Sequence, residues 1–383
     1  MKVLFLNYEY PPLGGGAATA SSNILREFSK IPGLKVDLVT SSDDGYFHLE
    51  HIGENINIHK LPIGKNKKNL HFQSQKDLLA YSWKAYWYSK KLIKQNNYSL
   101  SHSFFSVPCG FLSLLFKASY KIPFIISLRG ADVPGYSERF SFIYGFLKPL
   151  IKLIWGKADA VVSNSEGLKK LALASKPDQK IDIIYNGTDV ENFKPDDNRR
   201  NKEKFIITLG GTRVTARKGI NYLIEAVYGL HQKYPQICVT VIGEGNEKEN
   251  LENLSKKLGI KDKIIFLGRV EYNKINAYYQ EASVFVLPSL NEGMSNAMLE
   301  ALASGLPIIA TDTGGTRELV SDGENGFIIK MKDSNDIANK IEVLIKDEDL
   351  RLKMAKKSRE KALQLSWKNV AAKYYEIYKK YSE

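Results

Sequence analysis

Short apolar runs of strand length alternate with longer amphipathic segments along most of the chain. This alternation is typical of βα units, which build a parallel sheet covered by helices. In the first half of the chain it predicts strands at Val3–Leu6, Val36–Thr40, Ile58–Leu61, Leu100–Phe104, Phe124–Ser127, Ala160–Ser163 and Ile181–Ile184.

A polar and charged stretch, FKPDDNRRNKEK at 193–204, separates this series from a second one. Its composition and Pro195 indicate a linker. After residue 335 the pattern is helical to the end of the chain. The second series predicts strands at Phe205–Leu209, Cys238–Ile242, Ile264–Leu267, Val284–Leu287, Ile308–Thr311 and Phe327–Ile329.

The two series predict an α/β fold with two Rossmann-like, doubly wound domains that face each other across a cleft. We expect the domains at 1–195 and 196–366, followed by a C-terminal helix at 367–383 that packs back on the first domain. Ligands of such sheets bind beyond the carboxyl ends of the strands, so the cleft is the expected site.

Length and charge extend this picture. A chain of 383 residues is long for one core, which also favours two domains. The excess of 55 Lys+Arg over 42 Asp+Glu gives a net charge of +13 and favours an anionic partner: nucleic acid, anionic lipid or a phosphorylated ligand. Two distant cysteines, Cys109 and Cys238, argue against a disulfide framework and fit a reducing cytosol.

The segment NEGMSNAMLEAL at 291–302 carries two glutamates, one before a predicted helix and one inside it. Pro288 ends the preceding strand, and Ser295 or Asn296 can cap the helix. Glu292 then lies on the loop and Glu300 on the helix. Gly293 and the amides of Met294, Ser295 and Asn296 would make the helix start an anion site. The alternative is that both glutamates are solvated charges beside an Ala-rich packing helix.

The segment LGGTRVTARKG follows the first strand of the second domain. It places Gly210-Gly211, Arg213 and Lys218 at the carboxyl end of that strand. Cations are expected where a departing diphosphate must be neutralised. The alternative is that Arg213 and Lys218 are surface charges.

A glycine loop, Gly14-Gly15-Gly16, follows the first strand and enters a helix. A Rossmann dinucleotide loop would have glycine where this chain has Thr19, which argues against nicotinamide and flavin cofactors. A loop that faces the cleft near a phosphate or sugar fits better than a structural turn.

These segments together resemble retaining glycosyltransferases of the GT-B fold, the large family 4 group (glycosyl transferases group 1). The resemblance rests on the Pro-Pro and Gly-Gly start, IIYNGTD, GGTRVTARKG, the stretch PSLNEGMSNAMLEALASGLPIIATDTGGTREL and NGF at 325–327, and it spans nearly the whole chain.

The resemblance implies a role for each candidate residue. Arg213 and Lys218 would hold the donor diphosphate, and Glu300 the ribose hydroxyls. Glu292 would contact the donor sugar and phosphate with the backbone amides of the following turn. The remaining donor-binding candidates are Gly15, Gly16, Arg129, Gly211, Gly293, Met294, Ser295 and Asn296.

One position departs from the family pattern. Many relatives end a strand with a His-Gly pair whose histidine touches the donor sugar, whereas this chain has Arg129 before Gly130. Arginine stays charged and cannot act as a general base. Arg129 could instead bind the sugar, a carboxylate or a phosphate, or it could pair with Asp132.

We expect no metal and no cofactor. The acidic cluster Asp347-Glu348-Asp349 is typical of a solvated helix start. The six histidines lack the grouping of a zinc site, and His102 fits a satisfied core histidine. A nucleotide-sugar is then substrate, and basic side chains with helix dipoles carry the phosphate charge.

Residues 60–94 contain nine lysines and one acidic residue, Asp77, among many aromatic side chains. This composition fits an interfacial helix on an anionic membrane, and the stretch from Phe140 to Lys157 adds to it. The alternative is ordinary core with a soluble lysine rim. Nucleic acid is not expected, because no binding module is present and the basic residues are spread over both halves.

The sequence therefore predicts a retaining glycosyltransferase that moves a sugar, from a UDP-sugar by preference, to an acceptor hydroxyl on a lipid-linked or surface-polysaccharide intermediate. It would work in the cytoplasm at the inner face of the membrane. A sugar-nucleotide epimerase of the same fold and a non-catalytic sugar-nucleotide-binding scaffold are the alternatives.

Overall fold

The computed structural model describes residues 1–65, 70, 73–136, 141–210 and 213–382, and for 141–146 the backbone alone. The chain divides into two compact units, Met1–Asn186 with Trp367–Glu383, and Gly187–Ser366. This division lies before residue 195, where the polar stretch suggests a boundary. Phe193 accounts for the difference, because its buried ring contacts the rings of Tyr272 and Tyr279 in the second unit.

The first unit contains an eight-stranded sheet in the order β3-β4-β2-β1-β5-β6-β7-β8. Neighbouring strands are parallel except β3 and β4. Every apolar run that predicts a strand in this half forms one. The strands are β1 (Lys2–Leu6), β2 (Lys35–Ser41), β3 (His48–Ile52), β4 (Ile56–Leu61), β5 (Leu100–Phe104), β6 (Phe124–Leu128), β7 (Ala160–Ser163) and β8 (Asp182–Ile183).

Strand β3 is the element that the apolar pattern misses. It reads HLEHI, lies at the edge of the sheet and has three exposed residues in its middle. An antiparallel edge strand next to solvent needs no continuous apolar run, so its sequence carries little strand signal.

The second unit contains a six-stranded, fully parallel sheet in the order β11-β10-β9-β12-β13-β14. Its apolar runs again all form strands. The strands are β9 (Phe205–Leu209), β10 (Ile237–Ile242), β11 (Ile264–Gly268), β12 (Val284–Leu287), β13 (Ile308–Thr311) and β14 (Gly326–Ile329).

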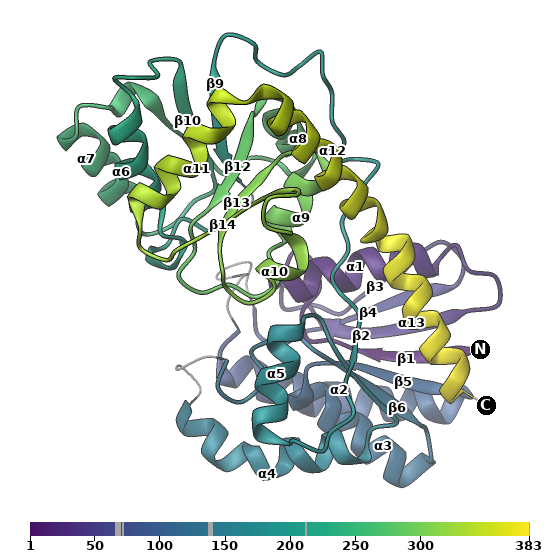
Figure 1. Ribbon diagram of the computed structural model, residues 1–383. Helices are drawn as coiled ribbons and strands as arrows, with labels where there is room; N and C mark the ends of the chain where they lie inside the picture. The colour runs from purple at the N-terminus through teal and green to yellow at the C-terminus, as the bar shows by residue number, and fades with distance from the viewer. Residues whose placement is uncertain (66–69, 71–72, 137–140, 211–212, 383) are drawn as a thin grey trace. The chain divides into compact units, whose positions relative to one another are not determined.

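Helices follow most strands and cover the sheets (Figure 1). In the first unit α1 packs against α13, and α3 packs against both α2 and α4. In the second unit α6 packs against α11, and α9 against α12. Those of the first unit are α1 (Gly16–Phe28), α2 (Gln75–Gln95), α3 (Phe111–Tyr120), α4 (Ser141–Lys157), α5 (Glu166–Ser175) and α13 (Trp367–Tyr381), with a π-helical turn at Ser106–Gly110. Those of the second are α6 (Ile220–Leu230), α7 (Lys248–Lys257), α8 (Tyr272–Glu281), α9 (Asn296–Ala303), α10 (Thr316–Leu319), α11 (Ser334–Lys346) and α12 (Glu348–Gln364), with short 3-10 turns at Ala216–Lys218 and Lys261–Lys263.

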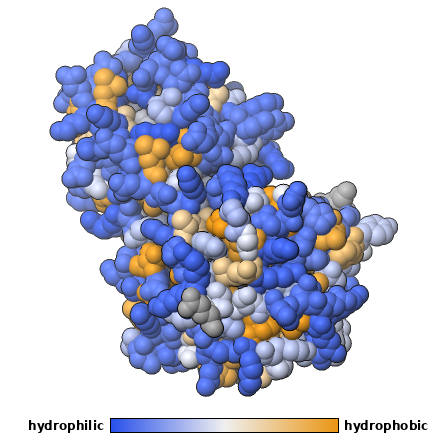
Figure 2. Space-filling model, turned by 90° about the vertical axis from the view of Figure 1, so that its right-hand side faces the viewer, coloured by the Kyte–Doolittle hydropathy of each residue, from blue (hydrophilic) through white to orange (hydrophobic). Residues whose placement is uncertain are grey.

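Apolar strands and inward helix faces form the interior of each unit. In the first unit, Trp367, Tyr374 and Tyr378 of α13 belong to the same core as the central strands. On the face shown in Figure 2, hydrophilic side chains predominate and hydrophobic ones form separate small groups. The chain thus sorts its side chains as burial of apolar area requires.

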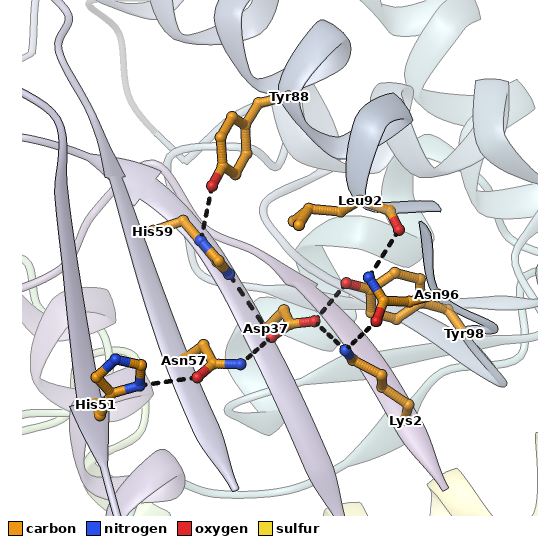
Figure 3. Close-up of polar contacts among 9 residues, drawn as sticks. All are labelled: Lys2, Asp37, His51, Asn57, His59, Tyr88, Leu92, Asn96 and Tyr98. Atoms are coloured by element: carbon orange, nitrogen blue, oxygen red, sulfur yellow. Dashed lines mark hydrogen bonds and ion pairs between the residues drawn. The ribbon is translucent and has the colours of Figure 1, made fainter. Parts of the chain in front are cut away.

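A buried carboxylate, Asp37 of β2, joins the sheet to α2 and the segment after it (Figure 3). Asn57 Nδ2 donates to Asp37 Oδ1 at 2.6 Å, Lys2 Nζ lies 2.9 Å from Oδ2, and the Tyr98 hydroxyl also donates to Oδ2. His59 Nε2 lies 3.6 Å from Oδ1. Burial by itself would raise the pKa of Asp37, but these hydrogen bonds outweigh it and hold the pKa well below its usual value.

We predict that Asp37→Asn lowers the free energy of unfolding at neutral pH by about 3 kcal/mol, because Lys2 loses its ion-pair partner and keeps only the hydrogen bond to Asn96 Oδ1. A depressed carboxyl pKa stabilises the fold above the unfolded pKa of about 3.9 and loses that effect as pH falls. Thermal melts should therefore show a lower melting temperature for the variant than for wild type, and this difference should narrow below about pH 4. Glu54→Gln, an exposed change in the turn before β4, is the control. Equal melting of all three proteins at neutral pH would contradict the prediction.

Candidate active site

The order of the second sheet reverses between β9 and β12, because the chain adds β10 and β11 on one side and β12 to β14 on the other. Loops that leave neighbouring strands in opposite directions open a crevice at such a point. Lys218 ends the 3-10 turn after β9, and Glu292 lies in the loop after β12. Two of the candidate residues are therefore placed at this switch point.

Lys218 and Glu292 form a largely buried ion pair across these two loops. Lys218 Nζ lies 2.5 Å from Glu292 Oε2, and the Ser289 hydroxyl donates to the same oxygen at 3.3 Å. The side chains are 10% and 19% exposed. The alternative of a solvated charge is therefore wrong for Glu292, and the alternative of a surface charge is wrong for Lys218, because each is the other's counterion.

The loops around this pair contact one another through backbone atoms. The Leu290 amide donates to the Arg217 carbonyl at 2.7 Å, and the Gly315 amide to the Gly293 carbonyl at 3.2 Å. A Cβ on Gly219 would lie 2.2 Å from the Pro288 carbonyl oxygen. Position 219 therefore requires glycine, because any side chain would clash with the Pro288 carbonyl oxygen and the backbone φ is positive, at 61°.

Helix α9 begins at Asn296, and Ser295 caps it by accepting a hydrogen bond from the Met298 amide at 3.4 Å. The predicted cap at this position is confirmed. Met294 and Ser295 are buried, whereas Gly293 and Asn296 are partly exposed. A helix leaves the N–H groups of its first turn without partners inside the helix, so its start attracts anions.

Glu300 lies on α9 in a buried position, with the Tyr279 hydroxyl 3.4 Å from Oε2. Burial raises the pKa of Glu300 to about 8, against a smaller lowering by the Tyr279 hydrogen bond. The two glutamates of the motif therefore have different environments, one beside an ammonium group and the other beside a hydroxyl.

Arg213 has an exposed side chain in the loop after β9. Gly211 lies outside the described residues. Gly210 is buried against Tyr279, the residue that contacts Glu300: a Cβ on Gly210 would lie 2.9 Å from the Tyr279 hydroxyl. Tyr279 and Ser289 contribute to the site without having been predicted from the sequence. Tyr279 comes from α8, which carries no motif, and Ser289 lies within the motif stretch at a position that has no charge to single it out.

In the first unit, Gly15 and Gly16 are exposed at the start of α1, after β1. The Gly15 amide donates to Glu9 Oε2 at 3.2 Å, and the Glu9 amide donates to Asn7 Oδ1 at 3.1 Å. Glu9 thus fixes the glycine loop. Its place between the strand and the glycines is the sequence signal that could have identified it.

Arg129 follows β6 and is held by polar and aromatic groups of the first unit. Its Nη1 donates to Asn186 Oδ1 at 2.9 Å, its Nη2 to the Tyr374 hydroxyl at 3.4 Å, and its guanidinium lies 3.6 Å from the centroid of the Phe104 ring. Asp132 instead accepts hydrogen bonds from the amides of Arg129 and Ser106, both at 2.9 Å. The structure therefore does not show the alternative, a side-chain ion pair between Arg129 and Asp132.

The support of Arg129 continues inward to a buried histidine. The Tyr374 and Ser127 hydroxyls lie 2.9 Å apart, Ser127 Oγ lies 2.8 Å from His102 Nε2, and His102 Nδ1 lies 2.6 Å from the Tyr378 hydroxyl. Burial, with the nearby Arg129 charge, holds the pKa of His102 well below its usual value. The prediction of a satisfied core histidine is confirmed.

Two parallel-sheet Rossmann-like units define the GT-B fold. The structure matches sucrose-phosphate synthase from Thermosynechococcus elongatus with a TM-score of 0.82 at 21% identity, over 99% of this chain and 98% of that one. It matches Anabaena HepE in complex with UDP-glucose with a TM-score of 0.75 at 19% identity, over 99% and 100%.

Family models place the sequence within this fold class. Residues 14–192 match Glycosyltransferase Family 4, and residues 189–361 match Glycosyl transferases group 1. The chain belongs to the group 1 glycosyltransferases and is a transferase enzyme. The family assignment made from the motifs is confirmed.

Two curated relatives match this chain over different shares of their length. An uncharacterized glycosyltransferase of Methanocaldococcus jannaschii is 26% identical over 100% of this chain and 99% of its own. The N-acetylgalactosamine-N,N'-diacetylbacillosaminyl-diphospho-undecaprenol 4-alpha-N-acetylgalactosaminyltransferase of Campylobacter jejuni is 30% identical over 56% of this chain and 58% of its own.

We predict that Glu300→Gln changes how stability depends on pH. Because Glu300 binds its proton more tightly in the folded protein, the fold loses stability as pH rises from about 4.5 to about 8, by at most about 1.4 kcal/mol per pH unit. The glutamine variant lacks this loss. Its melting temperature relative to wild type should therefore rise across this interval in ligand-free thermal melts.

The control is Glu281→Gln, an exposed change at the end of α8. Its melting temperature should keep a constant offset from wild type over the same pH interval. A Glu300→Gln offset that is equally constant would contradict the raised pKa.

Proposed function

We propose that the enzyme transfers a sugar from a nucleotide diphosphate donor to an acceptor hydroxyl, with retention at the anomeric carbon. One observation carries the proposal: the carboxyl edge of the second sheet brings Lys218 and Glu292 together next to the capped start of α9. A cation and the start of a helix, which attracts anions, thus lie at the switch point of a Rossmann-like sheet.

The donor diphosphate would bind at Lys218, Arg213 and the first turn of α9. A diphosphate would compete with Glu292 for the Lys218 ammonium group, because both ligands are anionic oxygens. Glu292 would then accept hydrogen bonds from hydroxyl groups of the donor sugar. The ion pair thus keeps Lys218 ready for a phosphate without leaving a buried charge alone.

Glu300 would accept hydrogen bonds from the ribose hydroxyls of the nucleotide. Its carboxyl group is buried and has a weak hydroxyl contact at 3.4 Å. Two ribose hydroxyls that donate to it would stabilise its ionised form, because the carboxyl group is buried and poorly solvated. Affinity for the nucleotide should therefore depend on this carboxylate.

The chemical step would need no protein base. Lys218 and Arg213 would stabilise the charge that develops on the leaving diphosphate, and a leaving phosphate oxygen would take the proton of the acceptor hydroxyl. Arg129 cannot remove a proton at working pH and would act by binding and orientation. A metal ion is not required by this scheme, which remains a prediction.

We favour UDP as the nucleotide and a lipid-linked or surface-polysaccharide intermediate as the acceptor. The Anabaena structure that shares the fold contains UDP-glucose, and the Campylobacter relative is named for transfer to a diphospho-undecaprenol-linked glycan. With such an acceptor the enzyme would work in the cytoplasm, on the inner face of the membrane.

We predict that Lys218→Ala lowers kcat by about 100-fold or more, because a charge that stabilises the leaving group is lost. Arg217→Ala is the matched control: it removes an exposed cation one residue away and should keep activity within about twofold. Release of nucleoside diphosphate that depends on acceptor is the measurement. Thermal melts of each variant serve to place the assay temperature below its unfolding transition. A wild-type kcat in Lys218→Ala would contradict the proposed role of Lys218 at the leaving diphosphate.

We predict that UDP raises the melting temperature more than GDP or ADP. A ligand at about 100 times its dissociation constant stabilises the fold by about 2.7 kcal/mol. At about pH 9, above the raised pKa of Glu300, the shift should shrink in Glu300→Gln, because the ribose loses a charged acceptor worth about 1.5–3 kcal/mol. A larger shift with GDP or ADP would exclude UDP as the preferred nucleotide, and an undiminished shift in the variant would exclude the ribose role.

A further inference from the structure

Helix α2 carries a stripe of large apolar side chains that the protein does not bury. Leu79, Trp83 and Trp87 follow one another at four-residue spacing and are 71%, 68% and 49% exposed. Residues four apart lie on the same face of a helix. The other two tryptophans of the chain, Trp155 and Trp367, are 0% and 5% exposed.

The opposite face of α2 is fixed in the core, so the stripe has a defined orientation. Tyr81, Ala85 and Ile93 belong to the core of the first unit, and the Tyr81 hydroxyl donates to the Val39 carbonyl at 2.9 Å. Figure 3 shows Tyr88 of the same helix reaching His59 of the sheet, with its hydroxyl 2.9 Å from Nδ1. The stripe is therefore not misplaced core.

The surroundings of the stripe are strongly basic. Helix α2 contains five lysines and one acidic residue. That residue, Asp77, is engaged by the Ser74 amide at 2.8 Å and by Lys65 Nζ at 2.9 Å. Lys90 Nζ lies 5.0 Å from the Trp87 ring centroid. The lysines are Lys76, Lys84, Lys90, Lys91 and Lys94.

A second segment adds exposed aromatic side chains beside the same helix. Tyr46 and Phe47 precede β3 and are 74% and 46% exposed. The Phe47 ring contacts the Tyr88 ring of α2, with centroids 5.6 Å apart. Tyr88 lies on the side of α2 that faces the sheet, so this segment borders the helix without joining the stripe. We call the stripe itself, Leu79, Trp83 and Trp87, the α2 face.

We propose that the α2 face and its lysines bind an anionic lipid bilayer. Tryptophan favours the boundary between headgroups and acyl chains, and lysines around it attract anionic headgroups. In the described part of the chain no helix combines the length and apolar composition needed to cross a bilayer. Because the stripe is one side of a helix whose other side is in the core, the face would lie on the membrane surface, with Leu79, Trp83 and Trp87 inserted among the headgroups.

Charge favours a membrane over a protein partner. Protein interfaces are depleted of lysine in their centres, whereas this stripe has lysines among its exposed tryptophans. The inference names the surface by which the enzyme would bind the membrane. The biological reason for binding there rests on the proposed function. The surface itself rests on exposure and charge, which are independent of sugar transfer.

Tryptophan fluorescence of the full-length protein tests the inference directly, since two of the four tryptophans are exposed and both lie on α2. Vesicles of phosphatidylcholine mixed with phosphatidylglycerol should shift the emission to shorter wavelength, and vesicles of phosphatidylcholine alone should shift it much less. Added NaCl should weaken the effect, because it screens the lysines. No shift with anionic vesicles, or an equal shift with both kinds, would overturn the proposal.

Two pairs of variants assign the binding to this face. Trp83→Ser/Trp87→Ser should weaken vesicle co-sedimentation by about tenfold or more, whereas Tyr228→Ser/Tyr272→Ser, at exposed rings of the second unit, should not. Lys91→Glu/Lys94→Glu should weaken it likewise, and Lys256→Glu/Lys257→Glu at the end of α7 should not. Equal losses in test and control pairs would overturn the assignment.

A transfer assay with a short soluble acceptor separates this inference from the proposed function. The α2 variants should keep their kcat with that acceptor, which also shows that they fold. Vesicle binding that is unchanged in these active variants would overturn the surface and leave the transfer mechanism standing. Normal vesicle binding by an inactive Lys218→Ala would support both proposals at once.

Discussion

Close backbone contact at the carboxyl edge of the second sheet is the constraint on which the candidate site depends. A Cβ on Gly314 would lie 1.9 Å from the Glu292 carbonyl oxygen, and one on Gly245 would lie 2.0 Å from the Val214 carbonyl oxygen. Glycine at these positions lets loops from four parallel strands meet. Only with the loops in contact can Lys218, 74 residues before Glu292, reach its carboxylate.

The same edge assigns different electrostatic environments to the two glutamates of one motif. Glu292 precedes α9 and lies against an ammonium group, whereas Glu300 lies inside the helix layer beside the Tyr279 hydroxyl. A carboxylate with a cation can be exchanged for another anion, such as a phosphate. A carboxyl group that has no cation beside it can instead be stabilised in its ionised form by hydrogen bonds from neutral hydroxyl groups. The spacing of eight residues therefore places the two carboxyl groups in two different electrostatic environments.

The sequence predicts the parts of the fold that depend on burial alone. Apolar runs identify the parallel strands because both faces of such strands are covered, and β3 escapes because it is polar and at an edge. The candidate residues at β9 and β12 follow from strand ends. The Lys218–Glu292 pair, the hold of Glu9 on Gly15 and the cage around Arg129 do not follow, because each joins groups through loop geometry or distant chain segments.

Arg129 shows how a distant segment can determine a local property. Its guanidinium lies over Phe104 and reaches Tyr374, which stands 245 residues later on the helix that returns the chain to the first unit. An arginine needs flat apolar support and several acceptors when it is withdrawn from water. A histidine in its place would be smaller and would lose the guanidinium contacts with Asn186, Tyr374 and the Phe104 ring. The position of the Arg129 side chain thus depends on α13 as well as on the strand that precedes it.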